Sequence, residues 1–390
     1  MVAVRVVVLL AALAAAAACG GSGTSDTVGE GCAAEADVVL WGGTQWVELA
    51  QGLANDASEC LEYFITVPPE DNDRTALRSR EAFDEVRSAG PRIHPVAEIR
   101  YTGETGWREW AMEEGQTFYE AGAEARRRLE ESGLDVEEGE TWALNELSPE
   151  VLEDAPGWRE DVLEFMRGLY DGTAGMPKAR GIVFNIFIPS DSTDVAAYKA
   201  SLKAWLEDDA FWSELDKYVD FFAEEVYPSP LTWGVAGASL DERTEHLNDY
   251  LFHLLALAGD GPDEVIVARR VLVRTLLPLA NAAWPHEGIG KTNAVTAETM
   301  GAFVAAQVHA IRSYDGGGEP KQRIGFAWAP NEADPSYTDE GRDVVLSQLA
   351  TALRAAYEDS GEGACGGDLC EADVEGASFN DAWKDFSSWD

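Results

Sequence analysis

Acidic, amide and indole side chains recur where short β-branched or aromatic runs of this chain end. Paired carboxylates perform general acid and nucleophilic catalysis, and indole rings stack on the faces of sugars. These residue types in this pattern predict a site for carbohydrate chemistry that needs neither a metal nor a cofactor. The residues that carry the pattern are Trp41, Glu98, Arg100, Asn145, Glu146, Glu225, Tyr227, Trp328 and Glu332.

The elements that must position these residues alternate along the chain between strand-like runs and longer helical patterns. Helical spacing is clear in Leu247, Leu251 and Leu254, which lie three and four residues apart. Alternation of this kind without hairpin signals predicts a parallel sheet wrapped by helices. The strand-like runs are Asp37–Trp41, Leu61–Val67, Ile93–Tyr101, Thr141–Leu144, Gly181–Ile188, Tyr218–Tyr227 and Arg323–Trp328.

The expected fold class is therefore α/β, a (β/α)8 TIM-like barrel. Seven clear runs leave one strand to be found, and Glu264–Arg269 is the best candidate for strand seven. That stretch is also typical of a helix, so strand seven is expected to be irregular or missing. In such barrels the functional residues gather at the C-terminal ends of the strands, which is where the polar residues lie.

Trp142-Ala-Leu-Asn145-Glu146 resembles, in sequence and in strand number, a motif of the large clan of retaining (β/α)8 glycoside hydrolases. In that clan the Glu is the acid/base, and the Asn binds the sugar hydroxyl beside the reacting carbon. Phe326-Ala-Trp328 is similar to the end of strand eight, where a Trp lines the catalytic subsite. The resemblance implies these roles for Glu146, Asn145 and Trp328. From the residues alone, Asn145-Glu146 is equally well explained as the cap of a following helix.

The nucleophile departs from the pattern of the clan, which places a Glu at the end of strand seven. Glu225 is the best substitute, because period-two alternation puts Ala223, Glu225 and Tyr227 on one face of their strand. In a retaining enzyme the carboxyl of Glu225 should lie about 5–5.5 Å from that of Glu146. The fallback nucleophiles are Glu287 and Glu332.

Arg100 and Glu98 share a strand face, since positions two apart point the same way. Charged groups inside a barrel need partners, so this pair either orients a catalytic carboxylate or only joins strands. In the second case Glu225 is a structural carboxylate held by Arg100. The indoles leave a similar choice between stacking on sugars and packing in the core, and they are Trp41, Trp46, Trp233 and Trp284.

The first nineteen residues are typical of a secretory signal peptide, with Arg5, an apolar run and small residues before Cys19. Cys19 and its surroundings resemble the lipobox of bacterial lipoproteins, although Ala16 stands where Leu is usual. The resemblance implies an exported chain, lipid-anchored through Cys19 at the outer face of the cell membrane. The alternative is a plain signal peptide with an incidental cysteine. No later run is apolar for the eighteen residues that a membrane span needs, so we expect membrane contact through the lipid alone.

The remaining cysteines predict two disulfides, as their even number suggests for an exported chain. Cys365 and Cys370 should close a short loop, which leaves Cys32 to pair with Cys60. No histidine lies within ten residues of any of them, so a metal site is not expected.

The charge of the chain is strongly negative, with 29 Lys and Arg against 71 Asp and Glu and a formal net charge of −42. Such a field repels phosphate backbones, which excludes nucleic acid as an expected partner. Gly288-Ile-Gly290-Lys291-Thr292 resembles the end of a phosphate-binding loop, but Pro285 takes the place of the first glycine.

The expected organisation is a signal peptide (1–18), a lipid-anchored tether (19–35), a barrel (36–360) and a disulfide-closed tail packed on the barrel (361–390). The favoured function is a monomeric exported lipoprotein that acts as a retaining glycoside hydrolase on an extracellular glycan. A non-catalytic glycan-binding or scaffolding barrel is the alternative, supported by the missing Glu on strand seven. A solute-binding lipoprotein is less favoured, because that class needs two lobes.

Overall fold

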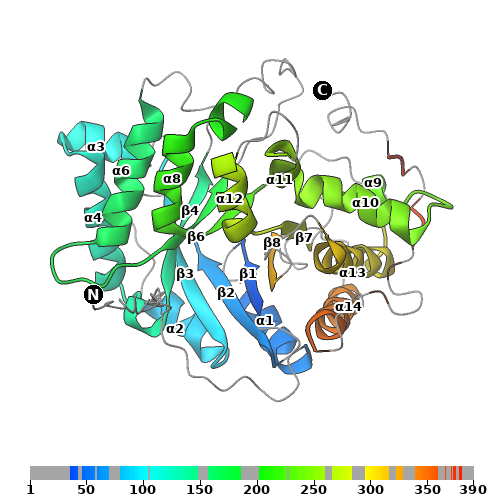
Figure 1. Cartoon of the computed structure of the whole chain (residues 1–390). Helices are drawn as coiled ribbons and strands as arrows, with labels where there is room; N and C mark the ends of the chain where they lie inside the picture. Colours follow the sequence, from blue (N-terminus) through cyan, green and yellow to red (C-terminus); the bar gives the residue numbers. More distant parts are fainter. Residues whose placement is uncertain are drawn as a thin grey trace, which may run out of the picture.

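Eight parallel strands form one sheet that curls into a nearly closed barrel with helices around it (Figure 1). In this computed structural model the described residues are 36–42, 46–57, 59–69, 80–103, 106–147, 157–185, 202–225, 228–259, 266–282, 295–315, 322–327, 339–358, 365, 370, 372–374 and 377–379. The strands are β1 (Ala36–Leu40), β2 (Leu61–Val67), β3 (Ile93–Arg100), β4 (Thr141–Leu147), β5 (Gly181–Asn185), β6 (Val219–Glu224), β7 (Leu279–Asn281) and β8 (Arg323–Ala327).

The strand order is β6-β5-β4-β3-β2-β1-β8-β7, so neighbours in the chain are neighbours in the sheet all the way round. The ring closes between β6 and β7 through a parallel bridge of Phe222 with Leu276, where the Leu277 N–H donates to the Phe222 carbonyl at 2.9 Å. The expected (β/α)8 barrel is confirmed.

The helices that wrap this barrel follow the strands in alternation and cover its outer surface (Figure 1). They are α1 (Trp46–Asp56), α2 (Arg80–Ser88), α3 (Trp107–Glu114), α4 (Phe118–Glu131), α6 (Trp158–Asp171), α8 (Asp209–Tyr218), α9 (Pro230–Trp233), α10 (Leu240–Leu251), α11 (His253–Leu257), α12 (Ile266–Thr275), α13 (Ala297–Ser313) and α14 (Asp339–Tyr357).

The prediction for strand seven is wrong in position. Residues 266–275 form helix α12, whose buried Ala268, Val271, Leu272 and Thr275 have the spacing of one helix face. Strand β7 lies farther along, at Leu279–Asn281, and is three residues long. Three residues without a β-branched side chain give too little signal for a strand to be recognised from the sequence.

Two separate cores hold the barrel. The outer core lies between the strands and the helices and includes Leu144, Leu147 and Phe222. The inner core fills the barrel itself, as in packed barrels of this class. Its fully buried members are Val39, Trp41, Val96, Ala143, Ile182, Phe184, Ala223, Leu277, Leu279 and Ala327.

The predicted Cys365–Cys370 disulfide is confirmed, with the two Cα atoms 5.3 Å apart. Cys60 is also disulfide-bonded, and its predicted partner Cys32 lies outside the described residues, as do Cys19 and everything else before residue 36. Near the C-terminus, the Asp373 carboxylate accepts from Arg243 of α10 at 2.6 Å, and the Val374 N–H donates to the Gly234 carbonyl at 2.7 Å. Among the described residues, no helix has the length and apolarity that a membrane crossing requires.

Candidate functional site

The C-terminal ends of the strands bring a group of polar side chains to one end of the barrel. The pairing register and the alternation of side chains place residues from every second strand at one level, as is usual in such barrels. One level is formed by Trp41, Glu98, Phe184 and Leu279, and the next level toward the C-terminal ends includes Asn145 and Glu225.

Trp41 and Phe184 form the floor beneath these polar groups. Their strands, β1 and β5, lie on opposite sides of the barrel, yet the two rings stack with centroids 5.2 Å apart and planes 19° apart. Trp41 is only 4% exposed and one face of its indole is covered, so any sugar contact would use what remains of the ring. Trp46 and Trp233 are fully buried in the outer core, and Trp284 and Trp328 lie outside the described residues.

Strand β4 carries a bulge at the predicted catalytic dipeptide. Leu144 pairs with Val183 and Leu147 pairs with Asn185, so three steps along β4 match two steps along β5. Leu144 and Leu147 both belong to the outer core. Two consecutive positions, Asn145 and Glu146, therefore lie between two outward-facing leucines, where a regular strand would have one. Bulges of this kind are frequent beside active sites, because they redirect side chains.

Asn145 is 9% exposed at this end of the barrel, on the inner face of β4. The backbone of Glu146 belongs to β4, but its side chain lies outside the described part of the structure. The distance between the carboxyls of Glu146 and Glu225 therefore stays a prediction.

Glu225 follows β6 directly, and its N–H donates to the Asn185 carbonyl at 2.9 Å, which extends the ladder by one residue. Ala223 lies in the inner core and Phe222 in the outer core, as the sequence alternation predicted. The same alternation puts Glu225 on the inner face, where its side chain is fully buried. Tyr227 lies outside the described residues.

On the inner face of β3, Glu98 is buried and Arg100 is partly buried, two residues nearer the open end. Their strand pairing places Arg100 beside Asn145 and Glu98 beside Ala143. The two charged residues thus belong to the same end of the barrel as Glu225. Which carboxylate Arg100 orients stays a prediction.

A second polar group lies behind this end, between the barrel wall and the helices, and sequence reasoning missed it. Asn185 Nδ2 donates to Glu224 Oε2 at 2.7 Å, and Glu224 Oε1 lies 3.9 Å from His253 Nε2 of α11. Burial raises the pKa of Glu224 well above its ordinary value and lowers the pKa of His253 to about 3. His253 is therefore neutral at neutral pH, and its Nδ1 donates to the Tyr250 carbonyl at 3.1 Å. The adjacent Glu224 and Glu225 thus have different surroundings, the first in the outer layer and the second in the barrel.

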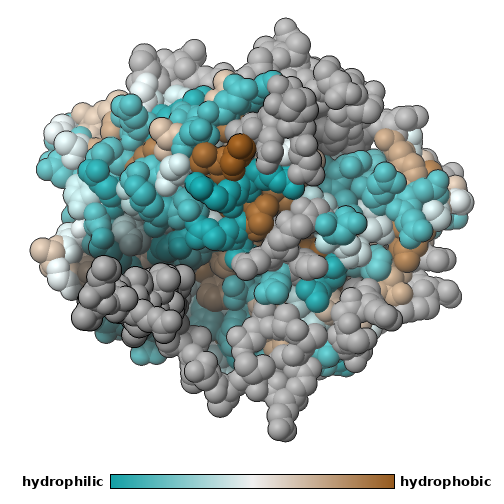
Figure 2. Space-filling view, viewed as in Figure 1, coloured by the Kyte–Doolittle hydropathy of each residue, from teal (hydrophilic) through white to brown (hydrophobic). Residues whose placement is uncertain are grey.

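A hollow of about 650 Å³ lies at the opposite end, where β3 and β4 begin. Charged side chains of both signs line it, among them Arg87, which donates to the two oxygens of Glu140 at 2.5 and 2.7 Å. The surface in Figure 2 is likewise mostly hydrophilic. Polar residues at this end of a barrel usually serve stability rather than catalysis.

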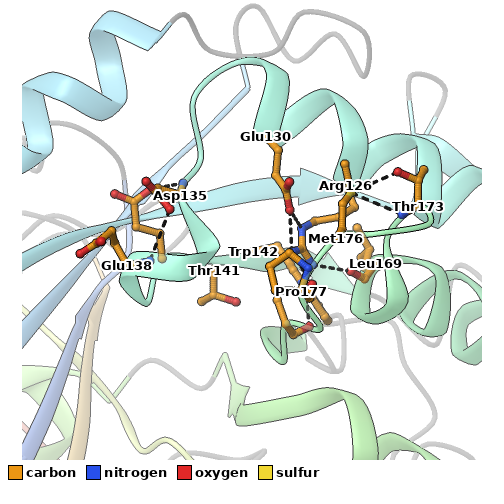
Figure 3. Close-up of polar contacts among 12 residues, drawn as sticks. Arg126, Glu130, Asp135, Glu138, Thr141, Trp142, Leu169, Thr173, Met176 and Pro177 are labelled. Atoms are coloured by element: carbon orange, nitrogen blue, oxygen red, sulfur yellow. Dashed lines mark hydrogen bonds and ion pairs between the residues drawn. The ribbon is translucent and has the colours of Figure 1, made fainter. Parts of the chain in front are cut away.

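Arg126 shows how this end of the molecule is held (Figure 3). Its guanidinium is fully buried and donates to Glu130 at 2.8 Å, to the Leu169 carbonyl at 2.9 Å and to the Pro177 carbonyl at 3.0 Å. The single side chain thereby joins α4 to the end of α6 and to the segment before β5. These bonds join three segments of the fold at this end of the barrel.

Among the described residues, no group of three or more His, Cys, Asp or Glu side chains could hold a metal ion. No protein-family model matches the chain, and no curated protein matches it. Among solved structures, a citrate lyase from Burkholderia xenovorans LB400 is similar with a TM-score of 0.32 and 10% sequence identity, over 81% of this chain and 77% of that chain. A likeness at this level says nothing about the activity of this chain.

Proposed function

We propose that this chain is a retaining glycoside hydrolase, with Glu146 as the acid/base and Glu225 as the nucleophile. The bulge in β4 is the observation that carries the proposal. It lies at Asn145-Glu146, at the C-terminal end of strand four, between the outer-core residues Leu144 and Leu147. A regular strand would turn Asn145 and Glu146 to opposite faces.

In the first step Glu146 would donate its proton to the glycosidic oxygen while a Glu225 oxygen attacks the anomeric carbon. The carbon–oxygen bond to the leaving group breaks, and a glycosyl ester on Glu225 forms. Glu146, now ionised, would then take a proton from water, whose oxygen attacks the same carbon and releases Glu225. Asn145 would hold the hydroxyl beside the reacting carbon, as the resemblance to the clan implies.

The strand order is compatible with this pairing. Strands β4 and β6 are separated only by β5, so their backbones lie about 10 Å apart at a spacing of about 4.8 Å per strand. Two glutamate side chains that reach inward from such positions can approach the roughly 5–5.5 Å that a retaining enzyme needs.

A non-catalytic glycan-binding barrel is the second candidate, and one observation favours it. Strand β7 ends in Asn281, at the place where the resembled clan carries its nucleophilic Glu. An amide cannot form the glycosyl ester. If Glu225 does not take over that role, the site binds sugars without cleaving them.

The place of action is also part of the proposal. The signal peptide and lipobox-like Cys19 support an exported, lipid-anchored monomer that meets an extracellular glycan. Replacing Cys19 by Ala should release the chain from the membrane fraction into the medium. Retention of the C19A protein in the membrane fraction would contradict the lipid anchor.

The test of catalysis compares two neighbouring glutamates. The wild type, E225Q, E146Q and E224Q are assayed against a panel of 4-nitrophenyl glycosides and polysaccharides. We expect E225Q and E146Q to lose at least about 1000-fold in kcat on a cleaved glycan, because each removes a chemical step. E224Q should keep wild-type activity, since alternation turns Glu224 away from the barrel interior and Gln keeps an oxygen that can accept from Asn185.

Azide then assigns the roles of the two glutamates. In E225A no carboxylate attacks the anomeric carbon of the glycoside. Azide should attack that carbon instead and give a glycosyl azide of inverted configuration. In E146A, azide attacks the glycosyl ester and should give the retained product. Full activity of E225Q would refute this nucleophile, and binding without turnover by the wild type would favour the second candidate.

A further inference from the structure

Strand β7 pairs with β8 along Leu279, Ala280 and Asn281. Its ladder with β8 includes the Ala282 N–H, which donates to the Ala327 carbonyl at 3.1 Å. Because backbone groups alternate along a strand, the N–H and C=O of Asn281 face the other side, toward β6. The described bridge to β6 lies several residues earlier, at Phe222 and Leu276.

Gln307 of α13 binds both backbone groups of Asn281. The Asn281 N–H donates to Gln307 Oε1 at 2.8 Å, and Gln307 Nε2 donates to the Asn281 carbonyl at 3.0 Å. A carboxamide offers one acceptor and one donor side by side, as a neighbouring peptide group would. Gln307 is fully buried, so this pair of bonds is made away from water.

The side chain of Asn281 belongs to the polar end of the barrel. Leu277 and Leu279 lie in the inner core, and the period of two continues to Asn281 on the same face. Strand β7 follows β6, which leads into Glu225, and β4 with Asn145 lies on the other side of β6. Asn145 and Asn281 thus belong to the same end of the barrel as Glu225, and a carboxamide can donate to and accept from a sugar hydroxyl.

We propose that Asn281 is a sugar-binding residue of this site and that Gln307 is the positioning residue that holds it there. The inference rests on the proposed function. It gives strand seven a residue that hydrogen-bonds to the substrate, where the resembled clan has the nucleophile. The two bonds from Gln307 also fix the C-terminal end of this short strand. Gln307 itself faces the backbone of Asn281 and acts only through it.

The test uses N281A, Q307M and the double variant, with Q348M of α14 as the matched control. Steady-state kinetics on a glycan cleaved by the wild type should show kcat/KM lower by about 10- to 100-fold in N281A and by about tenfold in Q307M. The double variant should be no worse than N281A alone, because both changes remove one interaction. Q348M should stay within about twofold of the wild type.

Hydrogen exchange gives a readout that does not depend on activity. The Asn281 amide should exchange at least about tenfold faster in Q307M and at an unchanged rate in Q348M, since Gln307 Oε1 accepts its proton in the wild type. If Q307M does not fold, Q307E replaces it. Glu keeps the acceptor and loses the donor, so it should protect this amide and still weaken the substrate kinetics.

The outcomes separate this inference from the proposed function. If the wild type neither cleaves nor binds any glycan of the panel, both the proposed function and this inference are wrong. If the wild type is active and N281A has the same kcat/KM, only the sugar-binding role of Asn281 is wrong. Additive losses in the double variant, or unchanged exchange of the Asn281 amide in Q307M, would overturn the positioning role of Gln307.

Discussion

Two adjacent glutamates show how much the surroundings of a residue decide. Glu224 lies in the layer between barrel and helices, with Asn185 as its partner, whereas Glu225 lies on the inner face among the site residues. Their chemistry is the same in the sequence, and their separation follows from the period of the strand. The same reasoning applies to acids at the opposite end of the barrel.

Asp37 at the start of β1 is the clearest case there. Burial raises its pKa from 3.8 to about 6, with Glu62 and Asp220 adding to the rise, while Arg323 and His94 oppose it. A folded pKa above the unfolded one means that Asp37 supports folding below about pH 4 and that this support is lost as the pH rises through about 6. The titration of Asp37 should therefore lower the free energy of unfolding over this range.

D37N removes that titration. Its free energy of unfolding relative to the wild type should rise between pH 4 and 7, toward at most about 3 kcal/mol. Urea denaturation at a series of pH values measures the difference. D343N makes the same change at an exposed position of α14 and is the control. A difference between D37N and wild type that stays level across these pH values would refute the assignment.

At the scale of elements, helices α4 and α6 lie side by side and cross through two glycines (Figure 1). A Cβ added at Gly122 would meet the carbonyl oxygen of Phe165, and one added at Gly168 would meet that of Tyr119. Both carbonyl oxygens are backbone atoms, so neither can move away as a flexible side chain would. The close approach of the two helices depends on these glycines.

G122A and G168A should therefore each lower the free energy of unfolding by about 3 kcal/mol or more, as overpacking does. G52A in α1 is the matched control, because a Cβ there meets nothing within 4 Å. It should be neutral or stabilising by up to about 1 kcal/mol. Thermal and urea unfolding of the three variants measure these free energies. Equal effects of G52A and G122A would contradict the claim that the close approach of α4 and α6 depends on glycine.

The elements also show what the sequence can and cannot predict. Strand β2 has the predicted bounds, because Leu61–Val67 is a long run with a clear pattern. Residues 107–131 form two helices and not one, because Gly115 ends α3 in the left-handed region and Thr117 caps α4. Strand β7 could not be found, because part of its support comes from Gln307 on α13, far along the chain.

The candidate site was only partly predictable for the same reason. Alternation within β6 correctly placed Ala223 inside, because the period of a strand is a local property. The bulge at Asn145 depends on pairing with β5, and the partnership of Glu224 with His253 depends on the packing of α11. Asn281 gains its place only when β7 is known. Features that arise from pairing between distant segments leave little trace in the local sequence.

At the scale of the whole molecule, the net charge of −42 should select among substrates. A field of this sign repels anionic glycans and leaves neutral ones unaffected. The repulsion acts over a Debye length of roughly 30 Å at 0.01 M salt and is largely screened at a few tenths molar. An aryl glucuronide should therefore show a kcat/KM that rises with salt, whereas the matched aryl glucoside should change little.

The competing influence is local. Arg100 lies at the open end of β3 and is the described cation of this site, so it could attract a carboxylate that the rest of the molecule repels. If attraction by Arg100 outweighs repulsion by the net charge, kcat/KM for the glucuronide should fall as the salt concentration rises, and R100Q should abolish that fall. If the overall field prevails, R100Q should leave the rising salt dependence in place. Measuring both substrates with both proteins between 0.01 and about 0.5 M salt separates the two effects, because screening weakens a field spread over the surface more than a buried contact.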